Sequence, residues 1–272
     1  MKSNLPHLAI LGGGNIGLSL ARGLIKSGKY KPADITITRR SNERLSAIAK
    51  EGFDATHDNS AAVKKAGVIV ISVLPQQLNE VLREISGSMQ PGQLVISVVS
   101  GAGSQDISSK LGRNIEVVRA MPNTAIAIGS SMTCIASSGA SKANMELVKS
   151  LFSTVGETIE IHEELMTSAT ALNACGIAFF LRAIRAASQG GVEIGFHAED
   201  ALRMAAQTAK GAASLLLENN SHPENEIDKV TSPKGCTIAG LNEMEHQGFS
   251  SAMIKGIRLS ASKAGELYSK ES

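Results

Sequence analysis

The stretch from Gly12 to Gly17 constrains the fold of this chain more than any other part of its sequence. It follows the apolar run Leu8–Leu11 and reads Gly-Gly-Gly-Asn-Ile-Gly. In this spacing the first glycine permits a tight turn, the second lets a ligand approach the backbone, and the third lets a helix pack on the strand. Because a helix starting in such a turn offers unpaired N–H groups to an anion, the stretch predicts a dinucleotide pyrophosphate site. A glycine-rich turn without a ligand is the alternative.

Short apolar runs alternate with amphipathic stretches as far as residue 161. The runs expected to be strands are Leu8–Leu11, Ile35–Thr38, Val68–Val73, Leu94–Val98, Val117–Arg119, Met132–Ile135 and Glu157–Ile161. The stretches expected to be helices are Ile16–Lys26, Glu43–Lys50, Ala61–Lys65, Leu78–Ile85, Gln105–Leu111 and Lys142–Phe152. Strands that alternate with helices are typical of a mostly parallel sheet. We therefore expect an α/β fold that begins with a Rossmann-type, doubly wound parallel sheet.

The residues after the second expected strand bear on which dinucleotide binds. NAD enzymes usually place an acidic residue there for the ribose 2′-hydroxyl. This chain instead has Arg39 and Arg40, followed by Ser41 and Asn42, and no acid before Glu43. Because guanidinium groups pair bidentately with phosphate, the segment favours NADPH, with NADH possible. The alternative is that one arginine is a solvated residue at a helix start.

Strand-like runs disappear beyond residue 163. Leu165–Gln189 carries apolar residues around most of a helical circumference, with Arg182 and Arg185 as its only charges. Such a helix is usually buried, and in a short chain we expect it at an oligomer interface. Ala198–Leu217 and Phe249–Leu267 are also expected to be helices. The sequence therefore predicts an all-helical second domain.

Composition excludes several classes of protein. The formal net charge of +2 is too small to indicate nucleic acid binding. Cys134, Cys175 and Cys236 form no CxxC pair, so we expect neither a metal site nor a disulfide framework. We expect no signal peptide, because the first residues lack a basic stretch followed by a long apolar one, and no uninterrupted apolar run reaches the roughly 18 residues of a membrane span. We expect a cytoplasmic protein that binds no membrane.

Three further motifs occur along the chain. They are Val73-Leu74-Pro75-Gln76, Val118-Arg119-Ala120-Met121-Pro122-Asn123-Thr124, and the TSPKGCTIAGL stretch at Thr231–Leu241. In order and spacing they resemble the pyrroline-5-carboxylate reductase family, whose stretches read approximately AVKPQ, VIRxMPNTP and TSPGGTTIAGL. Further segments resemble the family at Gly190–Gly195, Ala205–Thr208 and Glu218–Pro223. The resemblance covers nearly the whole chain.

The resemblance implies a fold and a reaction. Members of the family reduce the cyclic imine 1-pyrroline-5-carboxylate to L-proline, the last step of proline biosynthesis. It implies an NADP(H)-binding Rossmann domain at residues 1–162 and an all-helical dimerisation and substrate-binding domain at residues 163–272. In the family the helical domains interlock in homodimers, often assembled further into decamers, and the resemblance implies the same here. Each completes its partner's active site, which would explain why Leu165–Gln189 is so apolar.

The resemblance also implies two sets of site residues. The cofactor set consists of Gly12, Gly13, Gly14, Asn15, Ile16 and Gly17 for the pyrophosphate, Arg39 and Arg40 for a 2′-phosphate, Asn59 near the adenosine, Ser72, Val73, Leu74 and Pro75 beside the nicotinamide half, and Met121 and Asn123 close by. Met121 is expected to pack, and Asn123 to hold a loop through its side chain. The substrate set consists of Ser232, Lys234, Gly235, Cys236, Thr237, Asn173 and Cys175. A glycine-containing loop at a helix start is a natural carboxylate site.

Thr237 is the candidate catalytic residue. Its hydroxyl would hydrogen-bond the ring nitrogen of the imine. Because a hydroxyl is a poor general acid, we expect Thr237 to orient the imine, with the proton coming from water or from an imine already protonated. The alternative is an N-cap for a helix beginning near Ile238, and both roles could hold together.

The chain departs from the family's pattern at the implied substrate pocket. Asn173–Phe179 replaces SGSGPAY, Lys234-Gly235 replaces GG, and Cys236-Thr237 replaces TT, while Leu74 replaces the lysine of AVKPQ. Lys234 would favour a carboxylate by its charge, or it is a surface lysine on a widened loop. These departures keep two other hypotheses open: a divergent paralogue that reduces another cyclic imine, and an NADP(H)-binding regulator without turnover.

A further class shares the expected architecture. The β-hydroxyacid dehydrogenases combine a Rossmann domain with a helical domain, and use a catalytic lysine in the first long helix of the second domain. Leu165–Gln189 contains no lysine, which argues against that class.

Overall fold

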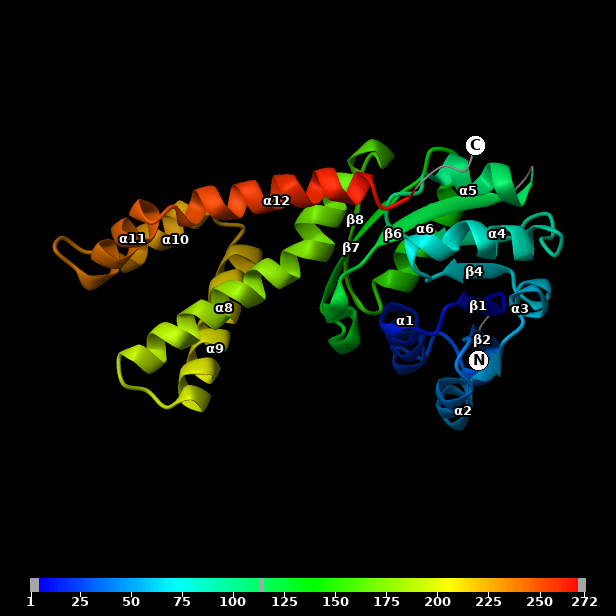
Figure 1. Cartoon of the computed structure of the whole chain (residues 1–272), viewed down its shortest axis with the longest axis horizontal. Coiled ribbons are helices and arrows are strands. Elements are labelled where there is room, and N and C mark those ends of the chain that lie inside the picture. Colours follow the sequence, from blue (N-terminus) through cyan, green and yellow to red (C-terminus); the bar gives the residue numbers. More distant parts are fainter. Residues whose placement is uncertain (1–4, 113–114, 269–272) are drawn as a thin grey trace. The chain divides into compact units, whose positions relative to one another are not determined.

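The computed structural model describes residues 5–112 and 115–268, and these form two compact units (Figure 1). The sheet unit comprises the chain up to Cys175 together with the residues from Leu259 onward. The helical unit is Gly176–Arg258. The domain boundary expected between residues 162 and 163 lies 13 residues before the start of the helical unit at Gly176, because the short helices that follow residue 162 pack within the sheet unit.

Within the described residues, the sheet unit holds an eight-stranded sheet in the order β3-β2-β1-β4-β5-β6-β7-β8. The strands are β1 (Leu8–Leu11), β2 (Ile35–Thr38), β3 (Asp54–Thr56), β4 (Val68–Ile71), β5 (Leu94–Ser97), β6 (Glu116–Met121), β7 (Ser131–Ala136) and β8 (Gly156–Glu160). Every pair is parallel except β6–β7, which is antiparallel. The order of the first six strands is that of a Rossmann fold, so the expected fold class is confirmed.

Helices complete the sheet unit. They are α1 (Asn15–Lys26), α2 (Asn42–Lys50), α3 (Asn59–Lys65), α4 (Leu78–Ser86), α5 (Ser104–Leu111), α6 (Lys142–Phe152) and α7 (Met166–Ala169), with short turns η1 (Pro32–Asp34), η2 (Pro75–Gln77), η3 (Thr124–Ile128), η4 (Glu163–Leu165) and the π-helical η5 (Thr170–Cys175). Side chains alternate between the faces of a strand, so Leu8 and Ile10 enter one apolar core while Ala9 and Leu11 enter another. A sheet buried on both faces needs apolar strands, which is why these runs were visible in the sequence.

The helical unit contains α8 (Gly176–Glu193), α9 (Ala198–Asn219), α10 (Pro223–Val230), α11 (Cys236–His246) and the start of α12 (Phe249–Gly265). Large apolar side chains on these helices stay exposed, among them Phe180, Leu181 and Leu217, the last with 82% of its surface accessible. A broad exposed apolar surface indicates a surface that another molecule covers. The stretch Glu163–Glu193 is also long and apolar enough to cross a membrane, judged by length and composition alone. The search for uninterrupted apolar runs in the sequence did not detect it.

Sequence reasoning erred in three elements. Strand β3 was not expected, because Asp54, Ala55 and Thr56 form no apolar run. Helix α10 was not placed, whereas α11 begins at Cys236, two residues before the start expected near Ile238. The single helix expected over Leu165–Gln189 is wrong: η4, α7 and the π-helical η5 precede α8, which itself continues to Glu193. A π segment inserts an extra residue per turn and leaves no mark on a pattern of 3.6-residue spacing.

The chain returns to the sheet unit near its end. Tyr268 is buried and belongs to the same apolar core as α4 and α5. Its hydroxyl donates to Oδ1 of Asn79 at 2.8 Å, and its Cβ would lie 2.9 Å from a Cβ built on Gly101. The last described residues are therefore part of the core of the sheet unit.

Candidate cofactor and substrate sites

Gly12 and Gly17 are required where β1 turns into α1. Gly12 has φ +103°, and a Cβ built on it would lie 2.3 Å from the carbonyl oxygen of Ser72, at the end of the neighbouring strand β4. A Cβ on Gly17 would lie 2.6 Å from the carbonyl oxygen of Gly12. The turn is thus closed against β4 on one side and against its own helix on the other, and no other residue fits either position.

The N-terminus of α1 is suited to hold an anion. Gly14 is the N-cap, and the first turn contains no acidic residue. The first helical hydrogen bond runs from Leu18 N to Gly14 O at 2.9 Å, so the N–H groups of residues 15–17 precede the intrahelical ladder. Near Gly14, a Cβ would meet only the Arg39 guanidinium, at 3.6 Å. A side chain there would fill the space above the helix end, which fits the pyrophosphate of a dinucleotide.

Arg39 lies against this turn. Its Nη1 donates to the carbonyl oxygen of Gly13 at 2.5 Å, and its backbone N donates to Thr56 O at 3.2 Å. Arg40 is exposed, and Ser41 caps α2 by accepting from Arg44 N at 3.5 Å. The Arg39 guanidinium therefore lies beside the glycine turn, and Arg40 follows it at the carboxyl end of β2.

The segment after β4 joins the same edge of the sheet. Ser72 N donates to Leu11 O at 2.8 Å, which continues the ladder between β1 and β4. Val73 packs against the apolar core, Leu74 is 63% exposed, and Pro75 begins η2. An apolar, exposed side chain at this edge suits contact with a planar ring.

Asn59 has a protein partner. It begins α3, and its amide Nδ2 donates to Oε2 of Glu84 on α4 at 2.8 Å. The contact holds two helices together, and the expected role near the adenosine stays a prediction.

Two asparagines from distant parts of the chain meet inside the sheet unit. Nδ2 of Asn123 donates to Oδ1 of Asn173 at 2.9 Å, and Oδ1 of Asn123 accepts from Ala125 N at 3.0 Å. Nδ2 of Asn173 donates in turn to the carbonyl oxygens of Met121 and Met132. Asn123 thus holds its loop through its side chain, as expected. Asn173 holds η5 against β6 and β7, so its substrate contact stays a prediction.

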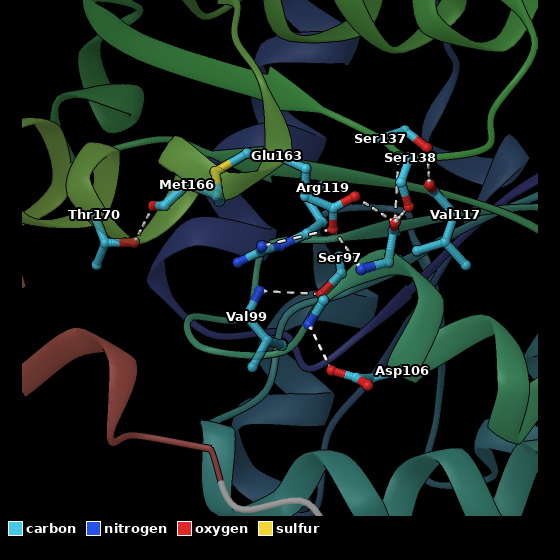
Figure 2. Close-up of polar contacts among 12 residues, drawn as sticks. Ser97, Val99, Asp106, Val117, Arg119, Ser137, Ser138, Glu163, Met166 and Thr170 are labelled. Carbon is cyan, nitrogen blue, oxygen red and sulfur yellow. Dashed lines mark hydrogen bonds and ion pairs between the residues drawn. The ribbon is translucent and has the colours of Figure 1, made fainter.

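A buried polar network that sequence reasoning missed joins β6, α5 and η4 (Figure 2). Nη1 of Arg119 lies 3.7 Å from Oε1 of Glu163, with 6% of the arginine side chain and 17% of the glutamate side chain accessible. Glu163 accepts from Ser104 N and Ser104 Oγ, each at 2.6 Å. Burial lowers the pKa of Arg119 despite the charge of Glu163. Among the described residues, Nε and Nη2 of Arg119 have no hydrogen-bond partner. The one available signal was a charged residue inside the apolar run of β6.

The implied substrate loop lies wholly within the helical unit. Lys234 has φ +58°, a left-handed conformation that glycine adopts more readily. Gly235 N donates to Ser232 O at 2.9 Å, and a Cβ on Gly235 would lie 2.6 Å from Ser232 Oγ. Gly235 is the N-cap of α11, whose first turn has no acidic residue. The loop therefore presents a helix N-terminus with a cation one residue before its cap.

Thr237 and the two cysteines near the implied pocket are partly accessible. Helix α11 begins at Cys236, so the N-cap reading of Thr237 is wrong: Gly235 takes that position, and Thr237 lies in the first turn. Cys236 is exposed, and Cys175 is half-buried at the end of the π-helical η5. By contrast, burial raises the pKa of the Cys134 thiol in β7.

Comparison with known proteins finds matches for the regions that contain both candidate sites. Residues 163–267 match the model described as "Pyrroline-5-carboxylate reductase dimerisation", and residues 7–101 match "NADP oxidoreductase coenzyme F420-dependent". A Dictyostelium discoideum protein named pyrroline-5-carboxylate reductase 2 is 49% identical over 97% of this chain and 93% of its own length. The chain belongs to the pyrroline-5-carboxylate reductase family. It is therefore an NAD(P)H-dependent oxidoreductase of that family.

Two further relatives support the assignment to the pyrroline-5-carboxylate reductases. Pyrroline-5-carboxylate reductase 1 of Dictyostelium discoideum is 52% identical over 97% of this chain, which spans only half the length of that protein. The solved structure of a pyrroline-5-carboxylate reductase from Coxiella burnetii matches with a TM-score of 0.89 and 29% identity, covering 98% of this chain and all of the other. The likeness extends over both units.

Proposed function

We propose that this chain reduces 1-pyrroline-5-carboxylate to L-proline with NADPH as the preferred hydride donor. One chain combines a dinucleotide-binding turn at Gly12–Gly17 with a reductase dimerisation match over residues 163–267, and this combination carries the proposal. The 49% identity to a reductase of nearly the same length supports the same reaction.

We assign the cofactor to residues 1–162. The N–H groups of Asn15, Ile16 and Gly17 would hold the pyrophosphate, because they precede the first helical hydrogen bond of α1. Arg39 and Arg40 would hold a 2′-phosphate, with Asn59 near the adenosine. The segment from Ser72 to Pro75, with Met121 and Asn123 behind it, would line the nicotinamide half. When bound, NADPH supplies the hydride.

We assign the substrate carboxylate to the loop before α11, in residues 163–272. The N–H groups of the first turn of α11 and the hydroxyl of Ser232 would donate hydrogen bonds to it, and the Lys234 cation would add attraction. The hydroxyl of Thr237 would hydrogen-bond the ring nitrogen and fix the face of the imine that receives the hydride. The proton on that nitrogen would come from water or from an imine already protonated. Asn173 and Cys175 would border the pocket from η5.

The exposed apolar surface of α8 and α9 supports a homodimer as the working form, with a higher assembly such as a decamer as a further possibility to test. In this proposal the helical unit of one protomer completes the site of its partner. A cytoplasmic location stays a prediction.

The proposal is tested by NADPH oxidation with racemic 1-pyrroline-5-carboxylate, with NADH in parallel and chiral analysis of the product. We expect L-proline, and a higher kcat/KM with NADPH than with NADH. NADPH binding without turnover on this imine would overturn the proposal. Turnover of another cyclic imine would then favour the divergent paralogue, and turnover of none the regulator, with the altered 173–179 and 234–236 segments as the cause.

A further inference from the structure

A histidine that the cofactor assignment does not use lies beside the two arginines. His57 is exposed and directly follows β3. Its Nδ1 lies 2.7 Å from the carbonyl oxygen of Arg39, and its Nε2 lies 2.7 Å from Oδ1 of Asn42. Because a carbonyl oxygen only accepts, Nδ1 donates to Arg39. One imidazole therefore links the loop after β3 to the end of β2 and to the first residue of α2.

The same contacts extend to the glycine turn. The side chain of Arg39 reaches Gly13 O, and its backbone N reaches Thr56 O, immediately before His57. The loops after β1, β2 and β3 thus form one connected set of polar contacts at the carboxyl edge of the sheet. This edge is where ligands bind in open α/β sheets.

The imidazole also holds the side chain of Asn42. The contact between Nε2 of His57 and the side-chain amide of Asn42 ties the first residue of α2 to the ring. Asn42 begins α2, directly after Ser41, Arg40 and Arg39. The imidazole therefore holds both ends of the segment Arg39–Asn42, which carries two arginines, and guanidinium groups pair bidentately with phosphate.

We propose that His57 is a specificity-determining residue that holds the segment Arg39–Asn42, with its two arginines, in position to receive the 2′-phosphate of NADPH. The inference rests on the proposed use of NADPH, but not on the identity of the imine. His57 acts through these neighbours, so its loss weakens the binding of the 2′-phosphorylated dinucleotide and leaves the binding of NADH nearly unchanged.

His7 provides a matched control. It is half-buried, directly precedes β1, and its Nε2 lies 2.8 Å from Oγ1 of Thr36 at the start of β2. Both histidines therefore link neighbouring strands of the same sheet, but His7 lies at the amino edge, opposite the glycine turn. A purely structural effect of losing an interstrand histidine contact would appear in both variants.

The test measures dissociation constants of NADPH and NADH by fluorescence titration of the full-length protein, without imine. We expect His57→Ala to raise the Kd of NADPH about tenfold and that of NADH less than about twofold. His57→Gln, which keeps a donor for the Arg39 carbonyl, should recover part of the loss, and His7→Ala should change neither constant. Equal losses for both dinucleotides, or none, would overturn the inference.

The readout separates this inference from the proposed reaction. A protein that binds NADPH selectively through His57 but reduces no pyrroline-5-carboxylate would overturn the reaction and leave the inference standing. A wild-type protein that binds NADH as tightly as NADPH would overturn the inference, even if L-proline formed.

Discussion

Arg119 and Glu163 form an ion pair in the interior of the sheet unit, with Nη1 and Oε1 3.7 Å apart. Glu163 also accepts two hydrogen bonds from Ser104, at the first residue of α5. A carboxylate at a helix N-terminus is favourable. Glu163 therefore joins strand β6 and helix α5 to the segment that leads towards the helical unit.

Replacing Glu163 by Gln should destabilise the protein in a pH-dependent manner. Burial acts to raise the pKa of Glu163, but the hydrogen bonds from Ser104 and the charge of Arg119 outweigh it, so the pKa lies below its ordinary value of 4.5. The carboxylate thus contributes its full stability above that value, and the contribution is lost as the pH falls through the lower folded pKa. At neutral pH we expect Glu163→Gln to lower the free energy of unfolding by about 3 kcal/mol.

Urea unfolding at one protomer concentration checks this, because an oligomer's stability depends on concentration. The difference in free energy of unfolding between Glu163→Gln and the wild type should become smaller at acid pH. Glu266→Gln is the control, since Glu266 forms an exposed ion pair with Lys263 and should change little. A pH-independent difference would show that the carboxylate's charge does not matter.

Replacing Gly17 by Ala should weaken dinucleotide binding. The added Cβ would lie 2.6 Å from Gly12 O and 2.9 Å from Cγ2 of Ile10, so α1 must move away from β1. We expect the Kd of NADPH to rise at least about tenfold, since a shift of this kind misplaces the N–H groups. Gly87→Ala is the control, because Gly87 ends α4 with φ −72° and a Cβ there meets nothing within 4 Å. Equal Kd values for the two variants would remove Gly17 from the cofactor site.

Replacing Lys234 by Gly should separate backbone strain from charge. Glycine adopts the observed φ of +58° freely, so Lys234→Gly should stabilise the protein by about 1 kcal/mol. Loss of the cation should raise the KM for the imine about tenfold with kcat nearly unchanged. Lys234→Ala should show the same KM without the gain in stability. An unchanged KM in both variants would show that the Lys234 cation does not contribute to binding the imine.

Replacing Thr237 by Val should lower kcat/KM for the imine by a factor of about 10 to 100, because one directional hydrogen bond to the substrate is lost. Thr237→Ser keeps the hydroxyl and should retain most of the activity. Since Gly235 provides the N-cap of α11, the helix should survive both changes, as circular dichroism can show. Full activity of the valine variant would exclude a role for Thr237 in catalysis.

The architecture could be predicted because its strongest signals are local. The glycine turn after Leu8–Leu11 and the apolar strands buried on both faces gave the sheet. The strands of residues 8–11 and 35–38 were placed without error. Strand β3 was missed because Asp54-Ala55-Thr56 forms no apolar run. It is a strand because it pairs with the adjacent strand β2, and its own composition does not indicate this.

The interior contacts of the candidate site could not be predicted for a different reason. Arg119 meets Glu163, and Asn123 meets Asn173, across long separations in sequence. No spacing rule links residues that far apart, so each could be seen as a polar residue in an apolar setting but not paired. The turn at η5 escaped because a π-helical segment obeys neither of the two periodicities that patterns reveal.

The burial of Tyr268 against Gly101 and Asn79 has a practical consequence for anyone who divides this protein. Both ends of the helical unit, Gly176 and Arg258, lead back into the sheet unit. After a single proteolytic cleavage between the units, both fragments therefore still contribute residues to the core of the sheet unit. Limited proteolysis would have to cut twice to release the helices. A truncation that stops at residue 162 would remove Tyr268 from the core beside α4 and α5, and we expect such a fragment to aggregate rather than bind dinucleotide.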